Sequence, residues 1–286
     1  RERLARATLM QATPATWYLL LAEGWTGGEG LKALCGGEAL SPRLAAELLA
    51  RTSSTWNMYG PTETTIWSAV RAVIPEDAGE GSAVSIGQPI ANTDLHLVDR
   101  GLRPVPAGAA GELCVGGSTL ARGYLGRPAL SAERFVPDPF RPPGRGGDRL
   151  YRTGDLARTL ADGTVQFLGR VDNQIKLRGF RIEPGEIEAV LGEHPEVTQG
   201  VVIVREDVPG NRYLAAYVVC GGDPPPAASE LRQYLKQRLP DYMVPTAFVP
   251  LDELPLNNNN KVDRRRLPVP IRTRPEGELR PPETPI

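Results

Sequence analysis

The sequence is 286 residues long, enough for one large domain or two ordinary ones, and it is 41% hydrophobic and 23% charged. Its formal net charge of −1 gives no support for nucleic acid or a membrane surface as the main partner, and no apolar run approaches the ~18 residues of a membrane-spanning helix. The three cysteines and two histidines are dispersed, which argues against a disulfide framework, a zinc site or a histidine-based mechanism. We expect a cytoplasmic protein and, because the chain starts without Met, a segment of a longer one.

An α/β pattern opens the chain over residues 1–56. Ser41 and Pro42 precede leucines at helical spacing, which predicts the N-cap and first-turn proline of an amphipathic helix. Before this helix, a short apolar run is followed by Gly36 and Gly37. Glycines at a strand end let the backbone approach a ligand in the crevice where open α/β sheets bind ligands, and a plain turn is an equally weighted alternative.

The segment NMYGPTETTIWS (57–68) is interpreted as a loop dense in chemically useful groups. Gly60 and Pro61 force a turn between an aromatic residue and a group of hydroxyls around Glu63. The flat face of Tyr59 suits a nucleotide base, and a carboxylate among hydroxyls suits Mg²⁺ beside phosphates. The alternative for Glu63 is an ordinary carboxylate at a helix start.

Residues 83–170 change to short strands separated by Gly and Pro, which predicts a small β barrel or meander. The expected strands are 94–98, 112–115 and 164–168. Two polar stretches, 116–125 and 151–156, are interpreted as loops, and so are residues 139–149. Asp155, which follows Thr-Gly, has the oxygens to accept both hydroxyls of a ribose, although the same sequence is typical of a plain turn.

The stretch GRVDNQIKLRGFRIEPGEIE (169–188) is the predicted joint between two domains. Residues 175–178 alternate apolar with basic as in a half-buried strand, Gly179 interrupts them, and Pro184 lies at a helix start. An α+β pattern follows, with strands at 201–204 and 213–219 and a helix lined by Leu231, Tyr234, Leu235 and Leu239. Four asparagines at 257–260 predict a tight polar loop, and the Pro-rich residues 269–286 a linker.

Six motifs in series resemble the adenylation domains of nonribosomal peptide synthetases, within the adenylate-forming superfamily of acyl-CoA synthetases and luciferases. They are NMYGPTE (57–63), GELCVGGSTLARGYL (111–125), YRTGDL (151–156), GRVDNQIKLRGFRIEPGEIE (169–188), LPDYMVP (239–245) and NNKVDR (259–264). The resemblance covers residues 7–268. It implies that the family's phosphate loop and the aspartate that grips the substrate amine lie upstream of Arg1, so that the chain is the C-terminal part of an adenylation domain.

The resemblance implies an incomplete α/β core with a β-barrel subdomain, followed by a small, mobile α+β domain. The expected core spans 1–171, with its α/β part at about 1–82 and the barrel at about 83–171. The C-terminal lid spans 172–268, and 269–286 is the linker.

The same resemblance assigns roles around ATP. Glu63 would hold Mg²⁺, Lys261 would bridge the substrate carboxylate and the nucleotide oxygens, and Asp155 would bind the ribose. The other implied nucleotide contacts are Gly36, Gly37, Asn57, Tyr59, Gly60, Phe167 and Arg170, with Tyr59 stacked on adenine. Three residues depart from the family pattern. Asn260 replaces the usual glycine before Lys261, Phe167 replaces a common tyrosine, and Pro184 replaces a common leucine but fits a helix start.

The implied lid motion has its own residues. Asp172 matches the residue about which the family's lid rotates. Lys176 and Gly179 belong to the strand and turn that this rotation would bring toward the thiol of a carrier protein.

The implied amino-acid pocket is apolar and crowded. Its positions map to Gln11, Leu34, Gly36, Met58, Ile66 and Trp67. Trp67 and Met58 are bulky, no residue offers a counter-charge, and the set resembles that of glycine-activating domains. The expected substrate is glycine, with alanine second, because an apolar pocket discriminates one methyl by only ~1–3 kcal/mol unless it is sterically blocked.

The expected reaction is amino acid plus ATP giving aminoacyl-AMP and pyrophosphate, followed by transfer to a carrier-protein phosphopantetheine thiol. The implied partners are a carrier domain downstream and a condensation domain upstream, and the family allows for a small MbtH-like activator. Two alternatives are an acyl- or aryl-CoA ligase of the same superfamily and a catalytically inactive fragment or docking platform.

Overall fold

The computed structural model describes residues 6–28, 30–79, 83–141, 149–172, 174–208, 211–222, 224–257 and 262–270. The chain separates into two compact units, Arg1–Arg181 and Ile182–Ile286. This division lies between residues 181 and 182, whereas the predicted lid begins at residue 172. The hairpin formed by 175–182 therefore belongs to the first unit as far as Arg181. The functional boundary at 172 stays a prediction.

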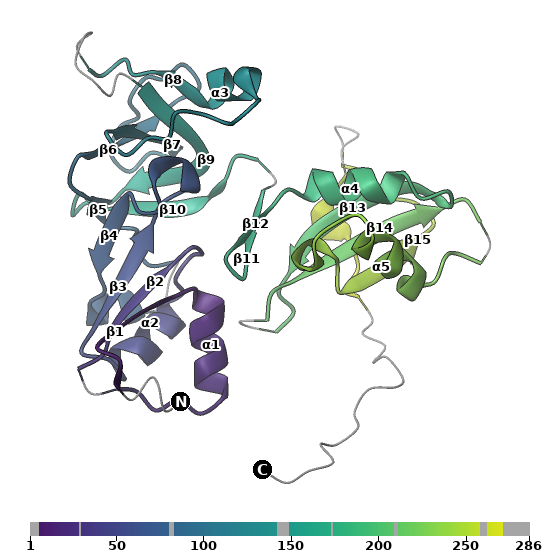
Figure 1. Ribbon diagram of the computed structural model, residues 1–286, viewed down its shortest axis with the longest axis horizontal. Helices are drawn as coiled ribbons and strands as arrows, with labels where there is room; N and C mark the ends of the chain where they lie inside the picture. Colours follow the sequence, from purple (N-terminus) through teal and green to yellow (C-terminus); the bar gives the residue numbers. More distant parts are fainter. Residues whose placement is uncertain are drawn as a thin grey trace. The chain divides into compact units, whose positions relative to one another are not determined.

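The first unit begins with a five-stranded sheet in the order β1-β2-β3-β4-β5 (Figure 1). The strands are β1 (Leu9–Ala12), β2 (Lys32–Gly36), β3 (Ser54–Tyr59), β4 (Ala69–Ala72) and β5 (Gln88–Pro89). The first three are parallel and the last two antiparallel. Parallel neighbours require crossover connections, and helices α1 (Pro14–Ala22) and α2 (Pro42–Leu49) supply them.

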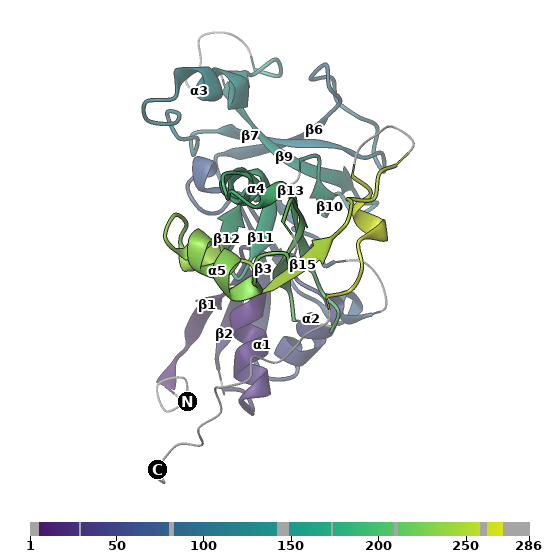
Figure 2. The ribbon, with the colours of Figure 1, turned by 90° about the vertical axis from the view of Figure 1, so that its right-hand side faces the viewer.

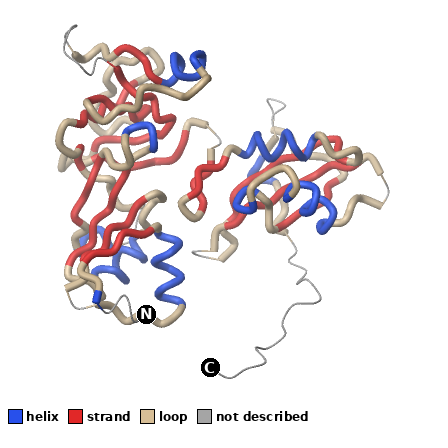
Figure 3. The backbone as a smooth tube through the Cα atoms, viewed as in Figure 1, coloured by secondary structure: helices blue, strands red, loops and turns tan. Residues whose placement is uncertain are grey.

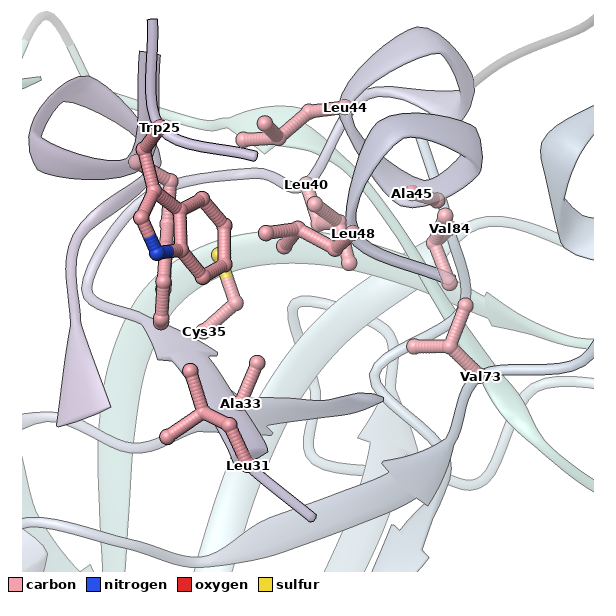
Figure 4. Packing of buried hydrophobic residues seen from close by; sticks show 11 residues of the cluster. Trp25, Leu31, Ala33, Cys35, Leu40, Leu44, Ala45, Leu48, Val73 and Val84 are labelled. Atoms are coloured by element: carbon pink, nitrogen blue, oxygen red, sulfur yellow. The ribbon is translucent and has the colours of Figure 1, made fainter. Parts of the chain in front are cut away.

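The predicted helix start at Ser41 is confirmed, because its hydroxyl accepts a hydrogen bond from the Leu44 amide at 3.2 Å and Pro42 occupies the first turn. Leu44 and Leu48 of this helix are fully buried and face β2 across the core (Figure 4). Since strand side chains alternate, Ala33 and Cys35 point into this core, which leaves the opposite face of β2 for other contacts.

The rest of the first unit is rich in strands, as the Gly- and Pro-punctuated sequence predicts (Figure 3). A second five-stranded, antiparallel sheet has the order β10-β9-β7-β6, with β8 paired to β9. Its elements are β6 (Thr93–Val98), β7 (Gly111–Gly117), α3 (Pro128–Arg134), β8 (Phe135–Pro137), β9 (Arg149–Thr159) and β10 (Val165–Arg170). A bridge between Gly87 and Val165 and a shared apolar cluster that includes Tyr59 and Leu113 join the two sheets.

Four stretches interpreted as loops are in part strands, which corrects that prediction. YRTGDL (151–156) lies inside the long strand β9, which already begins at Arg149. Asn57 to Tyr59 end β3, and Gly116 and Gly117 end β7. The polar composition of 151–156 is misleading because Thr153 is 1% exposed, donates to the Leu113 carbonyl at 2.6 Å and accepts from the Asp155 amide at 2.9 Å. The polar atoms of this segment are therefore satisfied inside a sheet.

The stretch after β10 forms a hairpin of β11 (Ile175–Leu177) and β12 (Phe180–Ile182). Its two turn residues, Arg178 and Gly179, have φ of 53° and 81°. Positive φ at both central positions is the signature of a type I′ turn, whose twist matches that of the flanking strands. The predicted strand and the glycine that ends it are confirmed.

The second unit has the predicted α+β pattern (Figure 2). Its sheet consists of β13 (Val197–Arg205), β14 (Tyr213–Cys220) and β15 (Ala247–Leu251), with an antiparallel first pair and a parallel second pair. Helix α4 (Pro184–Gly192) packs on β13 and α5 (Ala228–Lys236) on β15. Short 3₁₀ segments of the two units are Thr62–Thr64, Pro75–Ala78, Asp241–Met243 and Arg264–Arg266. Over the described parts of the chain, no helix has the length and apolarity to cross a bilayer.

Candidate functional site

The candidate site lies where β2 and β3 end. Gly36 and Gly37 close β2, and Tyr59 and Gly60 close β3. Gly37 has φ of 88°, and a Cβ atom placed on Gly60 would lie 2.2 Å from the Ile66 carbonyl oxygen. Only glycine fits at Gly60, because such a separation is far below any van der Waals contact. The carboxyl ends of parallel strands are where open α/β sheets bind ligands, as the sequence predicts.

A cleft that is open to solvent begins at these strand ends. It brings together most of the predicted nucleotide contacts, and among its lining residues are Gly37, Asn57, Tyr59, Gly60, Phe167 and Lys176. Asn57 is held in place because its side-chain amide donates to the Ser85 carbonyl at 2.8 Å. Phe167 reaches the cleft from β10 of the second sheet. The two sheets therefore supply the two aromatic rings of the cleft.

A buried carboxylate, Asp155, stands behind the cleft and is 1% exposed. Its Oδ2 accepts from the Tyr59 hydroxyl at 2.5 Å and its Oδ1 from Arg170 Nη1 at 2.5 Å. Lys176 Nζ lies 3.5 Å from Oδ2 and 5.3 Å from the centre of the Tyr59 ring. Burial, followed by the Asp155 charge, raises the pKa of Tyr59 well above its ordinary value, so the phenol stays protonated as the donor.

Arg170 joins this carboxylate to a second one. Its Nε and Nη2 donate to Oδ1 and Oδ2 of Asp172 at 2.6 and 2.7 Å, while Nη1 serves Asp155. The Arg170 side chain is only 8% exposed. Partial burial opposes ionisation of Asp172, but the hydrogen bonds and charge of Arg170 outweigh it and lower the pKa of Asp172. The predicted ribose residue and the predicted hinge residue thus share one guanidinium.

Glu63 is the centre of a separate cluster and is 7% exposed. Its Oε1 accepts from the Tyr124 hydroxyl at 2.6 Å and from Arg181 Nη1 at 2.7 Å, and its Oε2 lies 2.9 Å from the same Arg181 nitrogen. Arg181 Nη2 also reaches the Tyr151 hydroxyl at 3.4 Å. Burial alone would raise the pKa of Glu63, but the Tyr124 hydrogen bond and the Arg181 charge lower it.

The sequence analysis did not name Tyr124 or Arg181 as site residues. Both lie inside quoted motifs, Tyr124 in GELCVGGSTLARGYL and Arg181 in GRVDNQIKLRGFRIEPGEIE, so the signal was present. Their contact with Glu63 could not be predicted, because they lie 61 and 118 positions from it in the sequence.

Glu63 fits the magnesium role as a single ligand. Among the described residues, no group of three or more His, Cys, Asp and Glu is arranged to hold a metal by itself. Mg²⁺ at nucleotide sites is usually bound through one or two carboxylates, with phosphate oxygens and waters completing the octahedron. The single, nearly buried carboxylate of Glu63, whose pKa is lowered, meets that requirement.

Four of the predicted amino-acid pocket positions share one face of the first sheet. Gln11 pairs with Leu34 between β1 and β2, and Gly36 pairs with Met58 between β2 and β3. Partners in a parallel ladder point to the same side, and so do residues two apart in one strand. This face is opposite the one that α2 covers.

Trp67 closes this face at Gly36. A Cβ atom on Gly36 would lie 2.5 Å from the Trp67 Cη2 atom and 2.7 Å from the Met58 carbonyl oxygen. The remaining predicted position, Ile66, is 61% exposed at a backbone φ of 75°. Trp56, which the sequence analysis did not name, pairs with Leu34 and adds a second indole to the same face.

The hairpin tip also belongs to the site. The Gly179 amide donates to Glu38 Oε1 at 2.8 Å, and a Cβ atom on Gly179 would lie 2.8 Å from the Thr13 methyl carbon. Lys176 and Gly179, the predicted thiolation-state residues, are thus both placed against the cleft of the first unit. The predicted catalytic Lys261, with Asn260, lies outside the described residues.

Comparisons with known proteins identify the family. The model of the AMP-binding enzymes matches residues 4–125, and the model of their C-terminal domain matches residues 186–261. A dimodular nonribosomal peptide synthase of Bacillus subtilis (strain 168) is 54% identical over 92% of the chain, and tyrocidine synthase 1 of Brevibacillus parabrevis is 50% identical over 75%. The chain spans only 11% and 19% of the lengths of these relatives.

Solved structures agree with this assignment. A crystal structure of a four-domain nonribosomal peptide synthetase bound to AMP and glycine is 44% identical, with a TM-score of 0.54 over 92% of this chain and 19% of that one. A nonribosomal peptide synthetase protein containing adenylation and PCP domains, bound to a vinylsulfonamide inhibitor, is 32% identical, with a TM-score of 0.77 over 91% of this chain and 44% of that one. The chain therefore belongs to the family of AMP-binding, adenylate-forming enzymes, in its branch of nonribosomal peptide synthetase adenylation domains.

Proposed function

We propose that the protein containing this chain activates an amino acid with ATP as aminoacyl-AMP and transfers it to the phosphopantetheine thiol of a carrier protein. The observation that carries the proposal is the cleft at the ends of β2 and β3, whose two aromatic rings include Tyr59, the donor to the buried carboxylate of Asp155. The relatives named nonribosomal peptide synthetases and the related structure bound to AMP support it.

In this proposal the cleft binds the nucleotide. Tyr59 and Phe167 provide the faces for adenine, and the Gly36-Gly37 backbone, Asn57 and Gly60 let the ring approach the strand ends. Asp155 accepts the ribose hydroxyls. Its two oxygens already serve protein donors, but a carboxylate offers about four lone-pair positions, so capacity for two hydroxyls remains. Arg170, whose Nη1 lies 2.5 Å from Oδ1, orients this carboxylate.

Catalysis of adenylation requires charge stabilisation more than bond-making by the protein. Mg²⁺ held by Glu63 and phosphate oxygens would offset negative charge as the substrate carboxylate attacks the α-phosphate. Lys261 is assigned the carboxylate and nucleotide oxygens in the transition state, and Asn260 is expected to deliver it through a turn that asparagine tolerates. Pyrophosphate then leaves, and the thiol of the carrier attacks the acyl carbon with AMP as the leaving group.

We assign glycine as the amino acid and alanine as the second choice. The support is the contact of Trp67 with Gly36, which fills the space beside the strand end. The other assigned positions, Gln11, Leu34, Met58 and Ile66, carry no charge. A structure at 44% identity holds glycine together with AMP. A pocket closed by an indole discriminates by steric exclusion, which exceeds the ~1–3 kcal/mol that one methyl contributes in an open apolar site.

The partners follow from the assigned reaction. We assign a carrier domain downstream and a condensation domain upstream, with a small MbtH-like protein as an activator and the cytoplasm as the location. A related structure that contains adenylation and PCP domains supports the carrier assignment.

A second candidate function is a CoA ligase. Its support is the structure of o-succinylbenzoate CoA synthetase from Bacillus subtilis, 28% identical with a TM-score of 0.76 over 91% of this chain. A third candidate, an inert fragment or docking platform, predicts no nucleotide binding at all.

An ATP–pyrophosphate exchange assay on the full-length protein that carries this chain tests the proposal. We expect exchange with glycine, roughly tenfold or more weaker exchange with alanine, and none above background with large amino acids. The Lys261→Ala variant is the inactive control. A preference for a large amino acid overturns the glycine assignment, and turnover of a carboxylic acid with CoA but without amino-acid exchange favours the CoA ligase. No exchange with any acid favours the inert protein.

A further inference from the structure

The lone pairs of Glu63 that a metal ion would use are directed at protein donors. Oε1 accepts two hydrogen bonds, from Tyr124 at 2.6 Å and from Arg181 at 2.7 Å, and Oε2 accepts from Arg181 at 2.9 Å. Mg²⁺ requires a carboxylate oxygen at about 2.0–2.1 Å and near-octahedral geometry. The Arg181 guanidinium already engages both Glu63 oxygens, and its positive charge repels a metal ion.

The two partners of Glu63 differ in how they are anchored. Tyr124 belongs to the same structural block as Glu63, since the Ala121 amide donates to the Glu63 carbonyl at 2.8 Å and the Thr65 hydroxyl to the Thr119 carbonyl at 2.7 Å. Arg181 instead comes from β12, at the end of the first unit. Tyr124 is therefore held with Glu63 by local contacts, whereas the position of Arg181 depends on that of the hairpin.

The hairpin places a second cation in the same way. Lys176 Nζ lies 3.5 Å from Asp155 Oδ2 and above the Tyr59 and Phe167 rings at 5.3 and 5.9 Å. Seating of the hairpin thus directs one positive charge at the proposed ribose carboxylate and one at the proposed metal carboxylate. The pairing of Arg181 with Glu63 is the more exclusive, because its nitrogen engages both carboxylate oxygens.

We propose that Arg181 replaces the divalent cation at Glu63, so that the seated β11–β12 hairpin and a metal-bound nucleotide compete for one carboxylate. This inference rests on the proposed role of Glu63. The competition orders the two half-reactions. Adenylation uses Glu63 as a metal ligand with the hairpin withdrawn, and the hairpin seats once the metal–pyrophosphate product has left the carboxylate.

Tyr124 has a positioning role in this exchange. Its hydroxyl donates to Oε1 whichever cation is present, so it holds the carboxylate in one orientation for both partners. Like ligand-orienting hydrogen bonds around metals generally, this contact fixes the ligand without touching the substrate.

The test compares metal binding and hairpin protection in the full-length protein. Mn²⁺ serves as the probe, its free concentration followed by electron paramagnetic resonance in the presence of β,γ-methylene-ATP. Hydrogen exchange of the amides of residues 174–181 is followed over the same titration. The variants are Arg181→Gln, Arg181→Lys and Glu63→Gln, with Arg178→Gln, an arginine of the hairpin turn, as the matched control.

In the wild type we expect Mn²⁺ with the nucleotide to release hairpin protection in step with metal occupancy. Arg181→Gln should bind Mn²⁺ about fivefold more tightly or better, the lower range of ordinary coupling between two ligands, and its hairpin exchange should be fast at every Mn²⁺ concentration. Arg181→Lys, which keeps a charge, should lie between, and Arg178→Gln should match the wild type.

Unchanged Mn²⁺ affinity in Arg181→Gln, together with loss of affinity in Glu63→Gln, overturns the competition while leaving the metal role of Glu63 intact. Unchanged affinity in Glu63→Gln removes the metal role and the competition with it. Retained nucleotide binding in that case still supports the adenylating function, so the two failures are distinguishable.

Discussion

At the scale of single residues, the site is built from carboxylates whose charge is fixed by specific partners. Glu63 is nearly buried yet has a lowered pKa, because the Tyr124 hydroxyl and the Arg181 charge outweigh its burial. The pKa of Asp172 is lowered in the same way by Arg170. An unpaired carboxylate at Glu63 would be costly, since removing one partner of a buried pair leaves an uncompensated charge.

Tyr124→Phe should destabilise the first unit by about 1.5–3 kcal/mol near neutral pH, because a hydrogen bond to a charged acceptor is lost while the ring keeps its contact with Phe135. The pKa of Glu63 should rise toward its ordinary 4.5. A lowered pKa stabilises the folded state above the unfolded value and ceases to do so as the pH falls through the folded value. The cost of the substitution should therefore shrink below about pH 4.5.

Thermal unfolding of the full-length protein as a function of pH measures this effect. In a Glu63→Gln background, Tyr124→Phe should cost less and should lose its pH dependence, because the charged acceptor is absent. An equal cost in both backgrounds would mean that the hydroxyl acts through some other contact.

At the scale of elements, the β11–β12 hairpin supplies Lys176 to the lining of the cleft. The type I′ turn places Gly179 against Thr13 and Glu38, so that the tip is held by a backbone hydrogen bond and by close packing. The sequence predicts the strand and the glycine of this hairpin well, because alternation and turn chemistry are local. Its seating against residues from near the N-terminus is a long-range fact that no local pattern encodes.

Gly179→Ala should unseat the hairpin. Its Cβ atom would lie 2.8 Å from the Thr13 methyl carbon, and a positive φ costs an alanine about 1–2 kcal/mol wherever the hairpin is. The double variant with Thr13→Ser removes the methyl but keeps the hydroxyl that caps α1. Hydrogen exchange of residues 174–181 should be faster in the single variant and partly restored in the double variant. Absence of any restoration would show that only backbone strain matters.

The long strand β9 shows where sequence reasoning fails for an element. The motif YRTGDL has the composition of a loop, with Gly154 at a φ of 71°, yet it runs through the middle of a sheet. The Thr153 hydroxyl donates to the Leu113 carbonyl, 40 residues away, and accepts from the Asp155 amide. A polar composition indicates that the side chains of a segment need hydrogen-bond partners. Water supplies these partners to a loop, but distant strands supply them to a segment inside a sheet.

At the scale of the whole molecule, each of the two compact units contains one family-model match, residues 4–125 in the first and 186–261 in the second. The order of the six motifs was enough to predict the family and the fold class, because so many motifs in one order and spacing do not arise by chance. The amino-acid pocket was predicted less completely. Strand register places Trp56 beside Leu34, and register depends on pairings that the sequence alone leaves open.

Asp172→Pro should impair alternation between adenylation and thiol transfer, because proline fixes φ and restricts the preceding residue. We expect the ratio of the two rates to change by about a hundredfold, as misplacement of catalytic groups can cause. The matched control is Asp172→Ala, which loses the ion pair with Arg170 but keeps backbone freedom. Pyrophosphate exchange and loading of a carrier protein measure the two rates separately. Equal rates in the wild type and the proline variant would remove Asp172 as the hinge.

The shared guanidinium of Arg170 has a thermodynamic consequence. One cation serves a carboxylate of the cleft and a carboxylate at the proposed pivot, at 2.5 Å and 2.6 Å. An event that moves this guanidinium at one carboxylate would change its contact with the other, and such linkage is reciprocal in free energy. A nucleotide engaging Asp155 would then bias the torsion of the pivot, and the pivot would bias nucleotide affinity by the same factor. The chain would sense an occupied ribose site through a single side chain.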